Sequence, residues 1–192
     1  SQKIQQLELQ ALSHQLNPHF TFNALNSVCA LLEAQRYDDA ETMSEQLATF
    51  LRYSLSKSPD SLVQLADELA AINAYLQLQK TRFGNKLKVN CKIDDTLKQQ
   101  RIPALLLQPL VENAIKHNVV SHTKPLEITI KANGTAVLEV SNNLQPKINR
   151  EPSSNIGLNN INQRYEIITG RKIEVEKNDH EFKVTLPLIE IG

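Results

Sequence analysis

A histidine near the start of the sequence has the chemistry to accept a phosphoryl group. His19 lies in the stretch Gln15-Leu-Asn-Pro-His-Phe-Thr-Phe-Asn23. At about 100° per residue it falls at the edge of an apolar helical stripe, beside Gln15 and Asn23. A neutral imidazole is a nucleophile near neutral pH, which few other side chains are. A single histidine at such an edge is more often a boundary residue than a reactive one, so this stretch alone leaves both interpretations open.

A second group of polar side chains interrupts the otherwise apolar stretch Leu107–His117. Asn113, Lys116 and His117 are spaced i, i+3 and i+4, so on a helix they project to one side. Glu112 precedes them. An amide oxygen, an ammonium and an imidazole together suit a magnesium-bound polyphosphate, because Mg²⁺ prefers oxygen ligands and lysine neutralises phosphate charge. The alternative is a solvated helix face that binds nothing.

A glycine precedes a third helical stretch, in Ile156-Gly157-Leu158-Asn159-Asn160. The backbone N–H groups at the start of a helix bind phosphate well. Many helix starts carry a glycine, so this feature alone is weak evidence for a phosphate site.

The elements that position these residues change character near Arg82–Gly84. Before that point the chain is rich in Leu, Ala, Gln and Glu, which are strong helix formers. We expect helices from about Asp38 to Ser56 and from about Leu65 to Arg82, while Asn17-Pro18 either caps a new helix or kinks a long one. One helical hairpin buries only one apolar stripe, so a second copy, and hence a dimeric four-helix bundle, is expected. The stripe of the first helix consists of Leu9, Leu12, Leu16, Phe20, Ala24 and Leu31.

The second module alternates as strands do. The alternation of apolar and polar residues over Leu87–Ile93 predicts a strand with one solvent-facing side. The turn signal Asn133-Gly134 between two alternating runs predicts a β-hairpin. We expect a buried helix over Ile102–Val119 and another that starts after Asn155 and ends at Gly170. The last expected strands are 173–176 and 182–186. The predicted fold class is therefore α+β, with a helical hairpin followed by a sheet that has helices on one face.

Composition narrows the function further. The 192 residues carry 21 basic and 21 acidic side chains, and a net charge of zero argues against a direct nucleic-acid binder. Cys29 and Cys91 form neither a CxxC motif nor a Cys/His cluster, which excludes a zinc motif and favours cytosolic thiols buried in cores. The sequence has no run of about 18 apolar residues and no signal peptide, so it encodes no membrane span of its own.

Taken in order, these stretches resemble the LytS-like sensor histidine kinases, which pair with response regulators that carry a LytTR DNA-binding domain. The stretch Gln15–Asn26 resembles that family's phospho-acceptor box. Leu51–Leu55 and Glu68–Phe83 match its next helices. Leu106–His117 resembles the N-box of the ATPase superfamily shared with gyrase and the heat-shock chaperones, and Gly157–Tyr165 resembles its second glycine box.

The resemblance implies a dimerising, histidine-bearing helical hairpin over residues 1–82 and an ATP-binding α/β sandwich over residues 83–192. His19 would be autophosphorylated and would pass the phosphoryl group to an Asp of a response regulator, which we expect to be of the LytTR type. The residue directly after His19 is neither Asp nor Glu. Either Glu112 is therefore the general base, or no residue fills that role. We further expect a homodimer, and a cytoplasmic location beside the inner membrane of a bacterium, with the membrane anchor in the full-length protein.

The resemblance also implies that the second module binds ATP and Mg²⁺, with Asn113 as the metal ligand. The residues that it assigns to the nucleotide are Asn113, Lys116, His117, Asn142, Gly157, Leu158 and Asn159. Two departures stand out. Asn142 replaces the Asp that usually accepts from the adenine amino group, in a stretch without the usual glycines, and Asn155 replaces a first glycine. The alternative function is a degenerate kinase that acts as a dimeric binding module with little or no ATP turnover.

Overall fold

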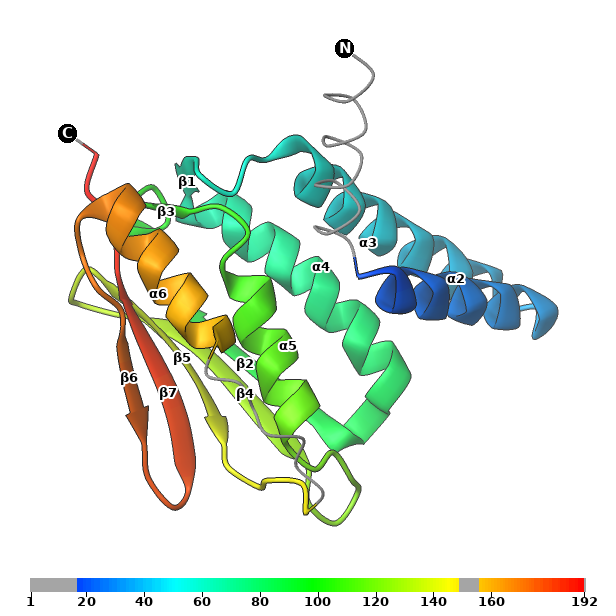
Figure 1. Cartoon of the computed structure of the whole chain (residues 1–192). Helices are drawn as coiled ribbons and strands as arrows, with labels where there is room; N and C mark the ends of the chain where they lie inside the picture. Colours follow the sequence, from blue (N-terminus) through cyan, green and yellow to red (C-terminus); the bar gives the residue numbers. More distant parts are fainter. Residues whose placement is uncertain (1–16, 149–155, 192) are drawn as a thin grey trace, which may run out of the picture. The chain divides into compact units, whose positions relative to one another are not determined.

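The computed structural model describes residues 17–148 and 156–191, which form two compact units (Figure 1). The helical unit comprises the described residues up to Lys57 together with Ala71–Arg82. The second unit comprises Ser58–Ala70 and the described residues from Phe83 onward. Helix α4 (Leu65–Phe83) therefore contributes residues to both units.

The helical unit begins at a capped helix. Asn17 has an extended backbone, and its side-chain oxygen accepts hydrogen bonds from the N–H groups of His19 and Phe20 at 3.1 and 3.3 Å. Proline at the first helical position needs no N–H partner. Helix α2 (Pro18–Glu33) therefore starts at Pro18, which decides between the two interpretations of Asn17-Pro18 in favour of a cap. Leu9, Leu12, Leu16 and Gln15 lie outside the described residues.

Helix α3 (Tyr37–Ser56) follows a short turn and packs against α2. Three aromatic rings form the centre of this unit. Phe20 lies 4.8 Å from Tyr75 and 5.3 Å from Phe50 between ring centroids, and all three residues are buried. The Tyr75 hydroxyl accepts a 2.8 Å hydrogen bond from the Gln79 side chain, which satisfies both buried groups. The predicted helices over 38–56 and 65–82 are confirmed.

The second unit is built on a mixed five-stranded sheet in the order β2-β4-β5-β7-β6. Strands β2 and β4 are parallel, and the other neighbours are antiparallel. The strands are β2 (Leu87–Ile93), β4 (Leu126–Ala132), β5 (Val137–Asn143), β6 (Glu174–Lys177) and β7 (Glu181–Pro187). Strand β1 (Leu62–Gln64) pairs with β3 (Arg101–Pro103) in a separate two-stranded sheet, and 3₁₀ turns cover Gly84–Lys86 and Asp95–Leu97. The predicted hairpin at Gly134 and the last two strands are confirmed.

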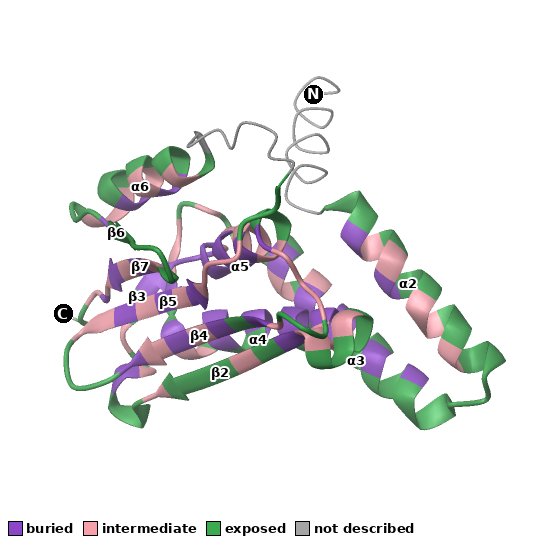
Figure 2. Ribbon diagram, turned by 90° about the horizontal axis from the view of Figure 1, so that it is seen from below, coloured by how far each residue is buried: buried purple, intermediate pink, exposed green. Residues whose placement is uncertain are grey.

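One face of this sheet is buried under helices α5 (Leu107–His117) and α6 (Ile156–Thr169) (Figures 1 and 2). Alternate residues of β4 and β5, such as Ile128, Ile130 and Leu138, point into the core and are fully buried. From α6, the buried Tyr165 donates its hydroxyl to the carbonyl of Pro187, and burial raises the pKa of that hydroxyl. The core thus fixes the two helices that carry the predicted phosphate-binding residues.

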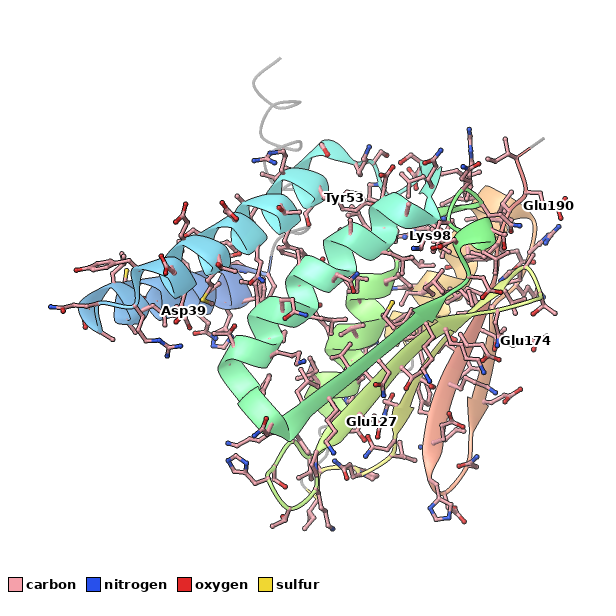
Figure 3. All side chains as sticks on the ribbon, turned by 180° about the vertical axis from the view of Figure 1, so that it is seen from behind. Asp39, Tyr53, Lys98, Glu127, Glu174 and Glu190 are labelled. Atoms are coloured by element: carbon pink, nitrogen blue, oxygen red, sulfur yellow. The ribbon has the colours of Figure 1, made fainter. Side chains whose placement is uncertain are left out.

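The reverse face of the sheet is polar, as Figure 3 shows around Glu127 and Glu174. Asn90 donates to Glu127 across the parallel pair at 2.7 Å, and Lys183 lies 3.2 Å from a carboxylate oxygen of Glu176. Ion pairs of this exposed kind add little stability. These polar side chains face solvent, in agreement with the predicted alternation of apolar and polar residues along Leu87–Ile93.

Two expectations are wrong. The helix expected over Ile102–Val119 covers only Leu107–His117, because Ile102 and Pro103 pair with β1 and Leu105 takes a left-handed backbone with φ of 58°. Cys29 and Cys91 are exposed residues and do not lie in a core. Cys91 lies on β2, an edge strand of the sheet, where fewer neighbours cover it.

Candidate functional site

Helix α5 divides its residues between a buried side and a polar side. Leu107 and Val111 are fully buried. Glu112 and Asn113 are half-buried, while Lys116 and His117 are exposed near the end of the helix. The Glu112 carboxylate accepts a 3.3 Å hydrogen bond from Gln108, one turn earlier. The polar side therefore offers one amide and two basic groups, Asn113, Lys116 and His117, at the spacing that the sequence predicted.

The start of α6 lies against the same part of α5 (Figure 1). A methyl group added at Gly157 would lie 3.8 Å from the side-chain nitrogen of Asn113. The structure thus brings Gly157 and Asn113 together, although they are 44 positions apart in the chain. Leu158 is half-buried and Asn159 is exposed in the first turn of α6. Asn155 lies outside the described residues.

Asn142 lies on the inner face of β5, next along that face to Val140, and is only 6% exposed. Its side-chain nitrogen donates to the carbonyl of Asn143 at 2.8 Å. Its side-chain oxygen accepts no hydrogen bond from any residue that the structure describes. Asn143, on the other face, uses both ends of its amide, accepting from Glu127 N–H and donating to the Pro125 carbonyl. Asn142 is therefore the member of the pair with a spare acceptor.

Asn118 is a site residue that the sequence did not reveal. It is 3% exposed, donates to the Ala114 carbonyl at 2.9 Å, and accepts from the Gln145 backbone N–H at 2.9 Å. Gln145 in turn donates to the carbonyls of Val119, Lys124 and Pro125. The end of α5 is thereby tied to the segment after β5. The expected helix over Ile102–Val119 included Asn118, so the sequence offered only its residue type as a signal, because asparagine side chains often bond to nearby backbone.

His19 lies in the first turn of α2 and is exposed. The Asn23 amide nitrogen is 3.4 Å from His19 Nδ1, one turn later on the same face. An amide next to an imidazole fixes which ring nitrogen carries the proton, since its oxygen accepts and its nitrogen donates. His19 belongs to the helical unit, whereas Asn113, Asn142 and Gly157 belong to the second unit. The predicted site therefore has two parts, the histidine in the helical unit and the nucleotide residues in the second unit.

The chain is similar to known proteins over most of its length. The histidine kinase family model matches residues 7–87. Sensor histidine kinase BtsS of Escherichia coli strain K12 is 40% identical over 167 residues, covering 84% of this chain and 29% of BtsS. Sensor protein LytS of Staphylococcus haemolyticus is 30% identical over 201 residues, covering 97% of this chain and 34% of LytS. The chain belongs to the LytS-like sensor histidine kinases.

The chain spans about a third of the length of these curated relatives. A solved structure described as a bacterial phosphotransferase aligns with 93% of this histidine kinase chain and 95% of its own, with a TM-score of 0.51 and 12% identity. That likeness shows a shared fold. Among residues 17–148 and 156–191, the kinase chain has no helix both long and apolar enough to cross a membrane.

We predict that Asn118→Ala loosens the segment after β5 in this kinase chain. The change leaves the Gln145 N–H without its acceptor, so the free energy of unfolding should fall by about 1–3 kcal/mol. Urea titration measures this loss, and hydrogen exchange should speed up at Gln145.

The matched control for that change is Asn133→Ala, which alters an exposed asparagine in the β4–β5 turn. It should leave exchange at Gln145 unchanged. Equal protection of Gln145 in the wild type and in Asn118→Ala would contradict the assigned role of Asn118.

Proposed function

We propose that this chain is the catalytic core of a two-component sensor kinase. It binds ATP·Mg²⁺ in the second unit, phosphorylates its own His19, and passes the phosphoryl group to an Asp of a response regulator. The observation that carries this proposal is the approach of Gly157 on α6 to Asn113 on α5, because it joins a helix start to the polar side of α5.

The residues around Asn113 fit a nucleotide triphosphate with its metal. The N–H groups at the start of α6 suit phosphate oxygens, and Lys116 supplies positive charge one turn beyond Asn113. Within the described residues there is no group of three or more His, Cys, Asp or Glu side chains that would hold a metal ion. This fits Mg²⁺ held by the Asn113 amide oxygen together with phosphate oxygens and water, which is how Mg²⁺ usually binds.

Asn142 fits the adenine end of the same nucleotide. Its spare side-chain oxygen can accept from an exocyclic amino group, while its nitrogen remains bonded to the Asn143 carbonyl. A neutral acceptor makes a weaker hydrogen bond than a carboxylate. We therefore propose that Asn142 replaces the family's Asp with lower adenine affinity and without loss of the contact.

The phosphoryl transfer that we propose is a displacement at the γ-phosphorus. A lone pair on His19 Nε2 forms the N–P bond, the bond from phosphorus to the β,γ-bridging oxygen breaks, and ADP leaves. Nε2 is free to attack only if the proton sits on Nδ1. The Asn23 amide nitrogen faces Nδ1 at 3.4 Å, which favours the proton on Nε2, so we propose that the amide turns its oxygen toward Nδ1 for the transfer. Bound Mg²⁺ supplies neutralisation of the phosphate charge.

The extra proton on the phosphorylated ring must then leave from Nδ1. His19 is exposed, so water can take this proton directly. Glu112 is the other acceptor that we consider, because it is the carboxylate beside Asn113 on α5. The chain therefore needs no acidic residue next to His19.

The partners that we propose are a second copy of this chain and a response regulator of the LytTR type. Helix α2 buries only Phe20 and Ala24, and it leaves a stripe of larger apolar residues in water. Phe22 is 65% exposed, and Leu25 and Leu32 are each 47% exposed. Pairing of two hairpins along this stripe removes it from water and gives the four-helix bundle.

We further propose that the chain works on the cytoplasmic side of an inner membrane, attached to the rest of a longer sensor. This rests on its family and on the third of the relatives' length that it matches. A degenerate kinase without ATP turnover is the weaker candidate, because His19, Asn113, Lys116 and Gly157 are all present and Asn142 keeps an acceptor.

The first test is labelling with γ-labelled ATP and Mg²⁺. Wild type should acquire an acid-labile, base-stable label, which is the signature of phosphohistidine. His19→Gln should abolish the label because the nucleophile is gone, yet keep ATP binding within a few-fold, because His19 belongs to the helical unit. His122→Gln changes another exposed histidine and should label normally. Persistent label in His19→Gln would show that another residue is the acceptor.

Asn113→Ala tests the proposed metal ligand. Loss of a buried polar partner costs about 1–3 kcal/mol, so magnesium-dependent ATP affinity should fall by roughly five- to 150-fold. Calorimetry with and without Mg²⁺ measures this. Asn160→Ala, an exposed asparagine of α6, is the control and should bind as wild type does. Equal affinity in Asn113→Ala and wild type excludes Asn113 as the ligand.

Asn142→Asp tests the adenine contact through opposite effects on stability and binding. The buried carboxylate would face the Asn143 carbonyl without a donor, so the unbound protein should lose about 1–3 kcal/mol of stability. ATP should bind more tightly, by about 1 kcal/mol or roughly fivefold, because the adenine amino group then donates to an ionised acceptor. Titration with a fluorescent ATP analogue and urea unfolding measure the two effects.

The control for that change is Asn143→Asp, since Asn143 lies on the other face of β5 with both ends of its amide in use. It should lose stability without any gain in affinity. A fall in ATP affinity in Asn142→Asp would mean that the site depends on the amide nitrogen, and no change would place Asn142 outside the nucleotide site.

A further inference from the structure

A buried carboxylate outside the proposed site holds the start of helix α5. Glu68 lies in the first turns of α4 and is 2% exposed. Its Oε1 accepts from the backbone N–H groups of Leu106 and Leu107 at 2.8 and 3.1 Å, and its Oε2 accepts from Leu105 N–H at 3.1 Å. Hydrogen bonds to an ionised acceptor are the stronger kind, so these three bonds compensate the burial of the charge.

These bonds replace a cap that α5 lacks in its own sequence. The residue before the helix is Leu106, whose side chain makes no capping hydrogen bond. The first N–H groups of a helix have no partner within the helix and favour a negative charge. Glu68, 37 to 39 positions earlier in the chain, supplies both the acceptor and the charge. It also holds Leu105 in its left-handed backbone conformation.

Arg164 of helix α6 holds the same segment from its carbonyl side. Its guanidinium donates to the Ala104 carbonyl at 2.7 Å, and Ala104 is fully buried. Burial lowers the pKa of the Arg164 guanidinium, and the nearby carboxylates of Glu68 and Asp60 act in the opposite direction. The segment Ala104–Leu107 therefore has an anion on its N–H groups and a cation on its carbonyl group.

The two helices that this segment joins are those of the proposed nucleotide site. Helix α5 carries Asn113 two turns after its capped start, and α6 carries Gly157 two turns before Arg164. A shift at Ala104–Leu107 changes the separation of Asn113 and Gly157, because both helices are fixed to it. The segment Ala104–Leu107 thus holds α5 and α6 at a point two turns away from both Asn113 and Gly157.

We propose that Glu68 and Arg164 are positioning residues for nucleotide binding, which act by clamping Ala104–Leu107 between α4, α5 and α6. This inference rests on the proposed ATP binding by the second unit. Glu68, Arg164 and the segment that they hold all belong to the second unit.

The test uses the whole chain and a fluorescent ATP analogue with Mg²⁺. Glu68→Gln keeps the size of the side chain but turns one acceptor into a donor that faces an N–H group. We expect its Kd for the analogue to rise by about tenfold, the factor that corresponds to one lost charge-assisted bond. Asp67→Asn is the matched control, since it removes an exposed acid from the same turn, and its Kd should stay within about twofold of wild type.

Arg164→Met provides the second arm and should also raise Kd. If both residues hold one segment, Glu68→Gln with Arg164→Met should bind only slightly more weakly than the weaker single variant. Hydrogen exchange at Leu105–Leu107 reports directly on the clamp and should speed up in both single variants. If Glu68→Gln fails to fold, the Kd and the hydrogen exchange of Arg164→Met alone test the proposal.

Two results would overturn the inference in different ways. Faster exchange at Leu105–Leu107 with an unchanged Kd would make Glu68 a purely structural cap. Purely additive effects of the two substitutions would mean that Glu68 and Arg164 do not act through one segment. A wild-type chain that does not bind the analogue would instead overturn the proposed function, and with it this inference.

Discussion

Helix α5 must bury one side in the core while its other side stays polar, and most of the second unit depends on this requirement. Leu107 and Val111 are fully buried against the sheet side, which fixes the rotation of the helix. That rotation leaves Asn113 half-buried and Lys116 exposed. The same core packs α6, so Gly157 reaches the Asn113 amide without a sequence signal that links the two. The geometry of the candidate site is therefore a consequence of apolar burial, and the polar groups contribute chemistry more than stability.

The features set by local chemistry were predictable from the sequence. The cap at Asn17, the hairpin at Gly134 and the end of α6 at Gly170 each depend on residues within one turn of each other. The separate polar groups on α5 were also visible, because their spacing places them on one side of a helix. Their proximity to Gly157 was available only through the family resemblance, since spacing along the chain says nothing about contacts between helices.

The features that failed depend on partners far away in the chain. Ile102-Pro103 looks helical because it continues an apolar run, yet it pairs with β1, and the Glu68 carboxylate caps the helix that starts at Leu107. The exposure of Cys91 follows from its place on an edge strand, which no local pattern identifies. Asn118 was overlooked for a related reason, because its acceptor oxygen is used by Gln145, 27 positions later.

A phosphoryl transfer gains its rate from positioning and charge neutralisation, since the protein forms few covalent bonds to the reacting atoms. In such an enzyme the residues that place the helices matter as much as those that touch the nucleotide. Asn118 fixes the end of α5, and Glu68 fixes its start. Asn113 and Lys116 lie between these two attachments, so neither can move along the helix axis without breaking a buried hydrogen bond. The polar side of α5 is thus held at both ends, which would lower the conformational entropy that the proposed nucleotide binding has to remove.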